Sequence, residues 1–139
     1  MGYEDLGDVK VREILKEAKN IAVVGLSDNP EKTSYEVAKI LQDAGYRIIP
    51  VNPLKIGKEI LGEKVYPSLE SVDIQIDIAD VFRPSDALPG VAEDFLKSNA
   101  KVFWAQLGIR NDDVADLLYV KGYDQVIMDR CIKIEYNAL

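Results

Sequence analysis

The chain has 139 residues, of which 47% are apolar, so it can form one domain with a substantial core and needs neither disulfides nor metals to fold. Its 24 acidic and 17 basic residues give a net charge of −7, which argues against broad binding to nucleic acids or anionic membranes. It contains no histidine and a single cysteine, Cys131, which excludes histidine-based triads, phosphohistidine chemistry, imidazole zinc sites and an internal disulfide.

The amino-terminal residues lack the basic start and apolar run of a secretory signal peptide. No apolar stretch approaches the ~20 residues of a membrane span. We therefore expect a cytoplasmic protein.

Apolar residues at helical spacing and short apolar runs alternate along the first half of the chain. Residues 9–19 have one apolar face and predict a helix, and the run at 21–25 is short and β-branched, as expected of a buried parallel strand. Helical spacing returns at residues 34–44. A second strand covers residues 46–51 and stops before Pro53, because proline cannot extend a ladder of hydrogen bonds.

The second half begins with a loop at residues 54–69, in which 64–66 predict a small extended piece. Ile74, Ile76 and Ile78 then alternate with polar residues and predict a third strand that ends at Phe82. The remaining elements are a helix that starts near Pro84 and Pro89 and runs through Leu96, a strand at 101–106, a helix between the cap Asn111 and Gly122, a strand at 124–128 and a short helical tail.

Strands separated by helices predict an α/β domain with a parallel sheet and right-handed crossovers. We therefore expect a single domain over residues 1–139, with a three-layer Rossmann-like fold, a five-stranded parallel sheet and helices on both faces. Open sheets of this class bind ligands beyond the carboxyl ends of their strands. The candidate loops are residues 25–34, 52–62, 82–86, 106–111 and 129–131.

The first of these loops begins at Gly25 and leads into a helix, whose free amides and dipole favour a phosphate. Ser27, Thr33 and Ser34 add hydroxyl groups, and Lys32 adds positive charge. A plainer interpretation is that Thr33 or Ser34 only caps the helix.

The second loop argues against ordinary NAD binding. The later glycines of the dinucleotide fingerprint are absent after Gly25, and the second strand ends in Asn52 rather than in an acid that would hold a ribose hydroxyl. Lys55 and Lys58 follow instead, where a phosphate on the ribose would lie. NADP and coenzyme A both carry such a phosphate, and a solvated surface lysine is the plain alternative.

The other loops offer fewer charged groups. Arg83 could clamp a phosphate, and Phe82 could pack on an adenine or simply fill the core. Gly108 would let a ligand approach the backbone closely. Asp80 and Asp129 lie near strand ends, where turn and cap roles are commonest. No pair of nucleophile and base is visible, so we expect no catalytic residue, no metal site and no autonomous enzyme activity.

Motifs spread along the chain resemble a known family. They are Gly25-Leu26-Ser27 with Ser34-Tyr35, Gly45-Tyr46 with Pro50-Val51-Asn52-Pro53, Ile60-Leu61-Gly62-Glu63 with Tyr66-Pro67-Ser68-Leu69, Asp80-Val81-Phe82-Arg83, Trp104 with Gln106-Leu107-Gly108, and Met128-Asp129-Arg130-Cys131. Together they resemble the small stand-alone CoA-binding proteins, which are similar to the N-terminal CoA-binding domain of the succinyl-CoA synthetase α subunit.

This resemblance implies a Rossmann-like domain that holds coenzyme A, or an acyl-CoA, across its strand ends. It implies that Ser27 and residues 32–34 meet the phosphates, and that Asn52, Pro53 and Lys55 meet the adenosine with its 3′-phosphate. It places Phe82, Arg83 and Pro84 beside the nucleotide, with Gln106 and Gly108 nearby.

One departure limits what the resemblance carries over. The synthetase subunit has a second domain with a phosphorylated histidine, which this chain lacks, so the ligase reaction is not inherited with the binding fold. The leading hypothesis is a CoA-binding module, with a partner protein or a homo-oligomer left open and no nucleic acid or membrane expected. The alternatives are an NADP-dependent oxidoreductase and a CoA-binding subunit of an acyl-CoA ligase or transferase.

Overall fold

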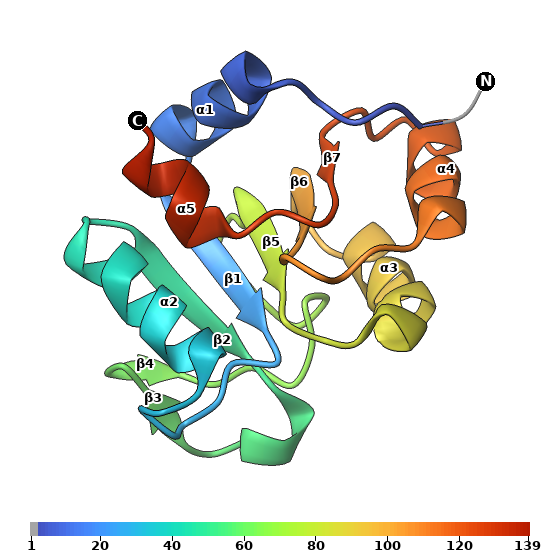
Figure 1. Cartoon of the computed structure of the whole chain (residues 1–139). Coiled ribbons are helices and arrows are strands. Elements are labelled where there is room, and N and C mark those ends of the chain that lie inside the picture. Colours follow the sequence, from blue (N-terminus) through green and yellow to red (C-terminus); the bar gives the residue numbers. More distant parts are fainter. Residues whose placement is uncertain (1–2) are drawn as a thin grey trace.

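The computed structural model describes residues 3–139 and confirms a five-stranded parallel sheet with flanking helices (Figure 1). The predicted domain also includes Met1 and Gly2, which lie outside the described residues. The strands of the sheet are β1 (Asn20–Val24), β2 (Arg47–Val51), β5 (Ile78–Val81), β6 (Val102–Ala105) and β7 (Val126–Ile127). Their spatial order is β2-β1-β5-β6-β7.

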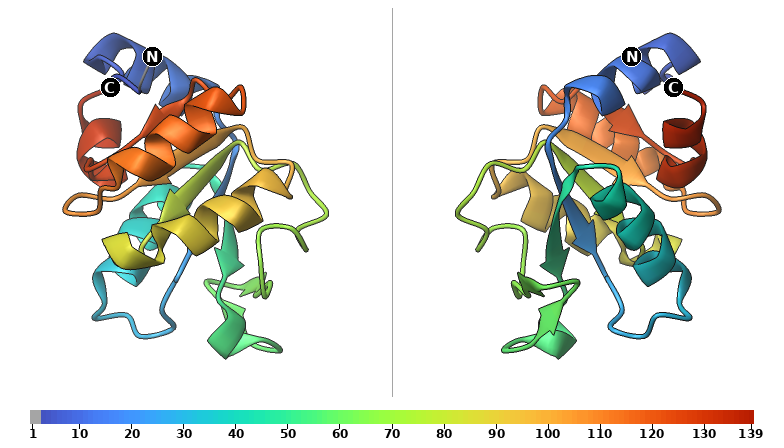
Figure 2. Two further views of the ribbon diagram at one scale, coloured as in Figure 1. Left: turned by 90° about the vertical axis from the view of Figure 1, so that its right-hand side faces the viewer. Right: turned by 90° about the vertical axis from the view of Figure 1, so that its left-hand side faces the viewer.

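The helices form the two outer layers of a Rossmann-like fold. One face of the sheet carries α1 (Asp8–Glu17), α2 (Thr33–Asp43) and α5 (Ile132–Asn137), and the other carries α3 (Leu88–Leu96) and α4 (Asp112–Val120) (Figures 1 and 2). Each face has its own apolar cluster, with Trp104 buried beneath the first and Phe95 beneath the second. Burial on both faces explains why β1 from Ile21 onward and β6 read as continuous apolar runs. None of the helices within residues 3–139 is long and apolar enough to cross a membrane.

The third strand differs from its prediction. β5 begins only at Ile78, and the alternating isoleucines before it lie outside the sheet. The side chain of Asn99 replaces a neighbouring strand there, because its Oδ1 accepts from the amide of Ile76 and its Nδ2 donates to the carbonyl of Ile74. The alternating isoleucines therefore marked a segment that the side chain of Asn99 binds, not a longer strand of the sheet.

The predicted loop at residues 54–69 contains more structure than expected. A 3-10 turn, η1 (Pro53–Lys55), is followed by a small antiparallel hairpin of β3 (Glu59–Ile60) and β4 (Glu63–Lys64). Tyr66 then pairs with Val51 at the end of β2. A second 3-10 turn, η2 (Ser85–Ala87), leads into α3. The predicted cap is confirmed, since Asn111 Oδ1 accepts from the amide of Val114 at the start of α4.

The strand order reverses between β1 and β5. The chain leaves β1 for β2 on one side and later returns to β5 on the other, and the helices that follow, α2 and α3, lie on opposite faces of the sheet. Ligands of open α/β sheets bind at such a reversal, beyond the carboxyl ends of the strands.

Candidate functional site

The first loop, residues 25–34, is fixed by its own side chains. The amide of Ser27 donates to Ser34 Oγ at 3.0 Å, the amide of Asn29 donates to Ser27 Oγ at 3.0 Å, and the amide of Glu31 donates to Asn29 Oδ1 at 3.0 Å. Short polar side chains that accept from amides one or two residues on are the usual way to hold a tight turn. The loop therefore has a defined shape before any ligand arrives.

The amino end of α2 has no side-chain cap. Lys32 precedes the helix with an extended backbone, and neither Thr33 nor Ser34 caps it, so the plainer interpretation of these hydroxyls is wrong. Ser34 is buried and accepts from Ser27 instead, whereas Lys32 and Thr33 are exposed. Amides in the first turn of an uncapped helix are free to bind an anion.

The second loop is tied to the first at two points. Asn52 Oδ1 accepts from the amide of Leu54 at 2.9 Å, which starts η1 at Pro53, and Asn52 Nδ2 donates to the carbonyl of Leu26 at 3.0 Å. Lys55 Nζ lies 3.3 Å from Asp28 Oδ2. Both loops project from the carboxyl end of the sheet, at the bottom of both views in Figure 2. Asp28 was not among the predicted site residues, because nothing in the sequence indicates that its carboxylate would pair with Lys55.

Gly25 lets the first and third loops approach each other. Its φ is +86°, and a Cβ at this position would lie 2.9 Å from the carbonyl oxygen of Phe82 and 3.1 Å from Cδ of Arg83. The Gly25 amide donates to the carbonyl of Val51, and the amide of Phe82 donates to that of Val24. The glycine is therefore required by both backbone conformation and close contact.

A hollow of about 430 Å³ opens at this edge, on the α3 side of the sheet. Most of its lining residues are apolar, and its charged groups are Arg83, Asp86 and Asp94; the lining residues are Val24, Val51, Pro53, Pro67, Arg83, Asp86, Ala87, Gly90, Val91 and Asp94. Of the predicted site residues it brings together Pro53 and Arg83. Phe82 lies on the other face of the sheet, half-buried against the cluster beneath α2 and α5. Pro84 is exposed beside this edge.

The fourth loop is anchored to the carboxyl-terminal segment. Gln106 is buried, and its Oε1 accepts from the amide of Ile132 at 3.0 Å, so it positions the start of α5. The amide of Gly108 donates to Asp129 Oδ1 at 2.6 Å. Asp129 thus holds a separate loop rather than a turn or cap of its own, and space around the Gly108 Cα is open.

Asp80 differs from its expected turn or cap role. It lies within β5, fully buried, with Val23 and Trp104 beside it in the neighbouring strands. Within residues 3–139 neither of its carboxyl oxygens has a hydrogen-bond partner. Burial raises the pKa of Asp80 well above its ordinary value of 3.8, because the charged form loses its hydration.

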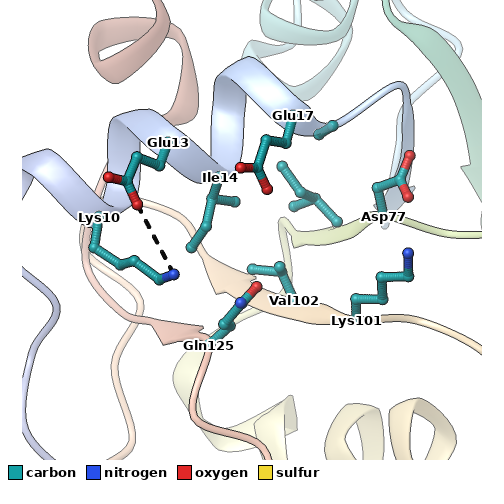
Figure 3. A pocket seen from close by; sticks show the side chains of 10 residues that line it. Lys10, Glu13, Ile14, Glu17, Asp77, Lys101, Val102 and Gln125 are labelled. Carbon is teal, nitrogen blue, oxygen red and sulfur yellow. Dashed lines mark ion pairs between the residues drawn. The ribbon is translucent and has the colours of Figure 1, made fainter.

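A second hollow, of about 200 Å³, lies at the opposite, amino end of the strands (Figure 3). Its charged groups are mostly committed to each other or to the backbone. Lys10 pairs with Glu13 at 3.9 Å, and Asp77 Oδ2 accepts from the amides of Lys19 and Asn20. The loops described above do not reach it, so the carboxyl edge is the candidate site.

Known proteins resemble this chain over most of its length. A family model described as "CoA binding domain" matches residues 19–137. The uncharacterized protein YneT of Bacillus subtilis is 54% identical over 127 residues, which cover 91% of this chain and 92% of YneT. A solved protein of Thermus thermophilus superposes with a TM-score of 0.90 at 35% identity, covering 96% of this chain and 98% of that one.

A longer relative matches only in part. The ADP-forming acetate–CoA ligase of Methanocaldococcus jannaschii is 35% identical over 83 residues, which are 60% of this chain and 12% of the ligase.

Proposed function

Because the chain belongs to the family of CoA-binding domains, we propose that it binds coenzyme A or an acyl-CoA through the ligand's phosphates and 3′-phosphoadenosine group. The observation that supports this most is the convergence of three features at one edge of the sheet. These are the uncapped amino end of α2, the cations Lys55 and Arg83, and a hollow with mostly apolar walls that Arg83 helps to line. A nucleotide with several phosphates matches that combination.

The pyrophosphate is assigned to the first loop. Gly25 and Ser27 shape the backbone there, and Lys32, Thr33 and Ser34 surround the free amides of α2. The helix dipole and unpaired amides stabilise negative charge at this position. Binding of the pyrophosphate in this loop needs no contact with the adenine base.

The adenosine and its 3′-phosphate are assigned to the second and third loops. Pro53 lines the hollow, Asn52 precedes it in the chain, and Lys55 follows two residues later with a side chain that is 32% exposed. Arg83 lines the hollow as well and is followed by Pro84, so an adenine ring would meet mostly apolar walls. The remaining arm of the ligand would extend past the buried Gln106 toward Gly108, which is exposed.

We propose further that the isolated chain binds without catalysing a reaction. Its sequence has no histidine and no visible pair of nucleophile and base. A second candidate is a CoA-binding module that serves a catalytic partner. The partial match to a long acetate–CoA ligase, of which this chain spans 12%, favours that candidate over an oxidoreductase.

Coenzyme A should stabilise the folded protein, and NAD should not. At ~100 times its dissociation constant, a ligand that binds only the folded state adds about 2.7 kcal/mol of stability. Thermal unfolding with CoA, acetyl-CoA, NAD and NADP measures this directly. An equal or larger shift with NAD, or none with CoA, contradicts the proposed function.

Replacing Lys55 with alanine should weaken CoA binding by about 1 kcal/mol and leave dephospho-CoA nearly unchanged, since the pair is partly exposed. Calorimetry on native and Lys55→Ala protein, each with both ligands, isolates the coupling between the lysine and the 3′-phosphate. Lys58→Ala is the matched control, because Lys58 is an exposed lysine of the same loop. If the coupling follows Lys58 instead, the assignment of Lys55 is wrong.

A further inference from the structure

We infer that Asp28 competes with the ligand's 3′-phosphate for Lys55 and thereby lowers the affinity of the protein for coenzyme A. The inference rests on the proposed function. It concerns the ion pair that joins the first and second loops, with Lys55 Nζ 3.3 Å from Asp28 Oδ2.

Asp28 has no evident part in holding its own loop. Within the described residues its carboxylate accepts no backbone amide, whereas Ser27 and Asn29 on either side of it both do. Asp77, Asp94 and Asp129 also accept amides and are fixed by them. The contact that the structure gives to the Asp28 carboxylate is the one with Lys55.

The two loops do not depend on this ion pair to stay together. Asn52 Nδ2 already joins them through the carbonyl of Leu26, and the Gly25 amide joins them through the carbonyl of Val51. These contacts involve backbone and partly buried groups. The Asp28–Lys55 pair is more exposed, with 38% and 32% of the two side chains accessible, so its partners can exchange at little cost.

A phosphate that binds Lys55 must therefore displace the carboxylate. Binding of coenzyme A would replace the Asp28–Lys55 ion pair with one between Lys55 and the 3′-phosphate. The free energy gained at Lys55 would be the difference between these two interactions. A ligand without the 3′-phosphate would leave the Asp28–Lys55 pair in place. Asp28 should thus weaken the binding of CoA but not that of dephospho-CoA.

The test is Asp28→Asn, measured by calorimetry with CoA and with dephospho-CoA at two salt concentrations. The expected result is about a two- to fivefold tighter binding of CoA, the range that a partly exposed ion pair allows, and for dephospho-CoA no more than the small change that removal of any one negative charge from this loop produces. Added salt should weaken CoA binding more in Asp28→Asn than in the native protein, because the native exchange keeps the number of ion pairs constant.

Two controls separate competition from a general effect of charge. Glu31→Gln removes the same charge from an exposed position of the same loop, and it should change the affinities for both ligands by one small, equal factor. In the double variant Asp28→Asn with Lys55→Ala, the gain for CoA should disappear. A gain that persists without Lys55, an equal gain for both ligands, or weaker CoA binding in Asp28→Asn would overturn the inference. Failure of the native protein to bind CoA at all would instead contradict the proposed function.

Discussion

Replacing Gly25 with alanine should destabilise the domain by about 2–6 kcal/mol. Two effects add at this position. A positive φ of +86° strains any residue with a Cβ by about 1–3 kcal/mol. The new Cβ would also lie 2.9 Å from the carbonyl oxygen of Phe82, a backbone atom that cannot turn away, and such overpacking typically costs about 1–3 kcal/mol more.

Gly57→Ala is the matched control for the first effect alone. Gly57 has nearly the same φ, +85°, but a Cβ there would meet nothing within 4 Å. Urea unfolding of the two variants should therefore give a smaller loss for Gly57→Ala, and the difference measures the close approach of the first and third loops. Equal losses would mean that the contact relaxes freely.

Because Arg83 Cδ lies 3.1 Å from the same Cβ position, Gly25→Ala should also weaken CoA binding in the protein that remains folded.

Replacing Asp80 with asparagine should stabilise the protein at pH 8. The Asp80 carboxyl is fully buried with no partner among the described residues, so at this pH it either keeps a proton that the unfolded chain has lost or carries an unpaired charge, and both lower the stability of the folded protein. Asparagine has a closely similar shape and removes the charge, although it still leaves a polar group unpaired. The measurement is the free energy of unfolding from urea titrations.

The gain from Asp80→Asn should depend on pH in one direction. Burial raises the pKa of Asp80 well above its ordinary value of 3.8. As the pH rises above that value, the unfolded chain loses the proton while the folded protein keeps it, so the stability of the native protein falls until the pH passes the folded pKa. The advantage of the variant should therefore be small below pH 4 and grow toward neutral pH. A constant advantage over this range would show that the Asp80 pKa is not shifted.

Asp94→Asn provides a control of opposite sign. Its two carboxyl oxygens accept from the amides of Leu69 and Glu70, at 2.7 and 3.0 Å. The side-chain NH2 of asparagine would face one of these backbone N–H groups, so one hydrogen bond could not form. The free energy of unfolding of this variant should therefore be lower by about 1–3 kcal/mol. If Asp80→Asn also lost stability at neutral pH, the carboxylate would have to have a partner.

Local patterns in the sequence determined the order of helices and strands and the loops that form the candidate site. Apolar runs such as residues 21–24 predict buried strands, because a strand covered on both faces has no polar alternation. The cap at Asn111 is equally local, since its side chain accepts an amide three residues on. Gly25 was assigned to the first candidate loop because it ends a predicted strand and because this loop leads into a predicted helix. Because parallel strands end at one edge, this order was also enough to predict that the first four loops lie together.

The tertiary structure decided which side chains within those loops meet. Lys55 and Asp28 are 27 positions apart, and their contact depends on β2 lying next to β1, which no spacing in the sequence specifies. The sheet register likewise decided that Asp80 is buried between Val23 and Trp104 rather than placed at a turn. The isoleucines before β5 misled for the same reason, because extended backbone needs a partner and Asn99 supplied it from a distant loop. Contacts across strands come from packing the whole chain, so they appear only once the sheet has assembled.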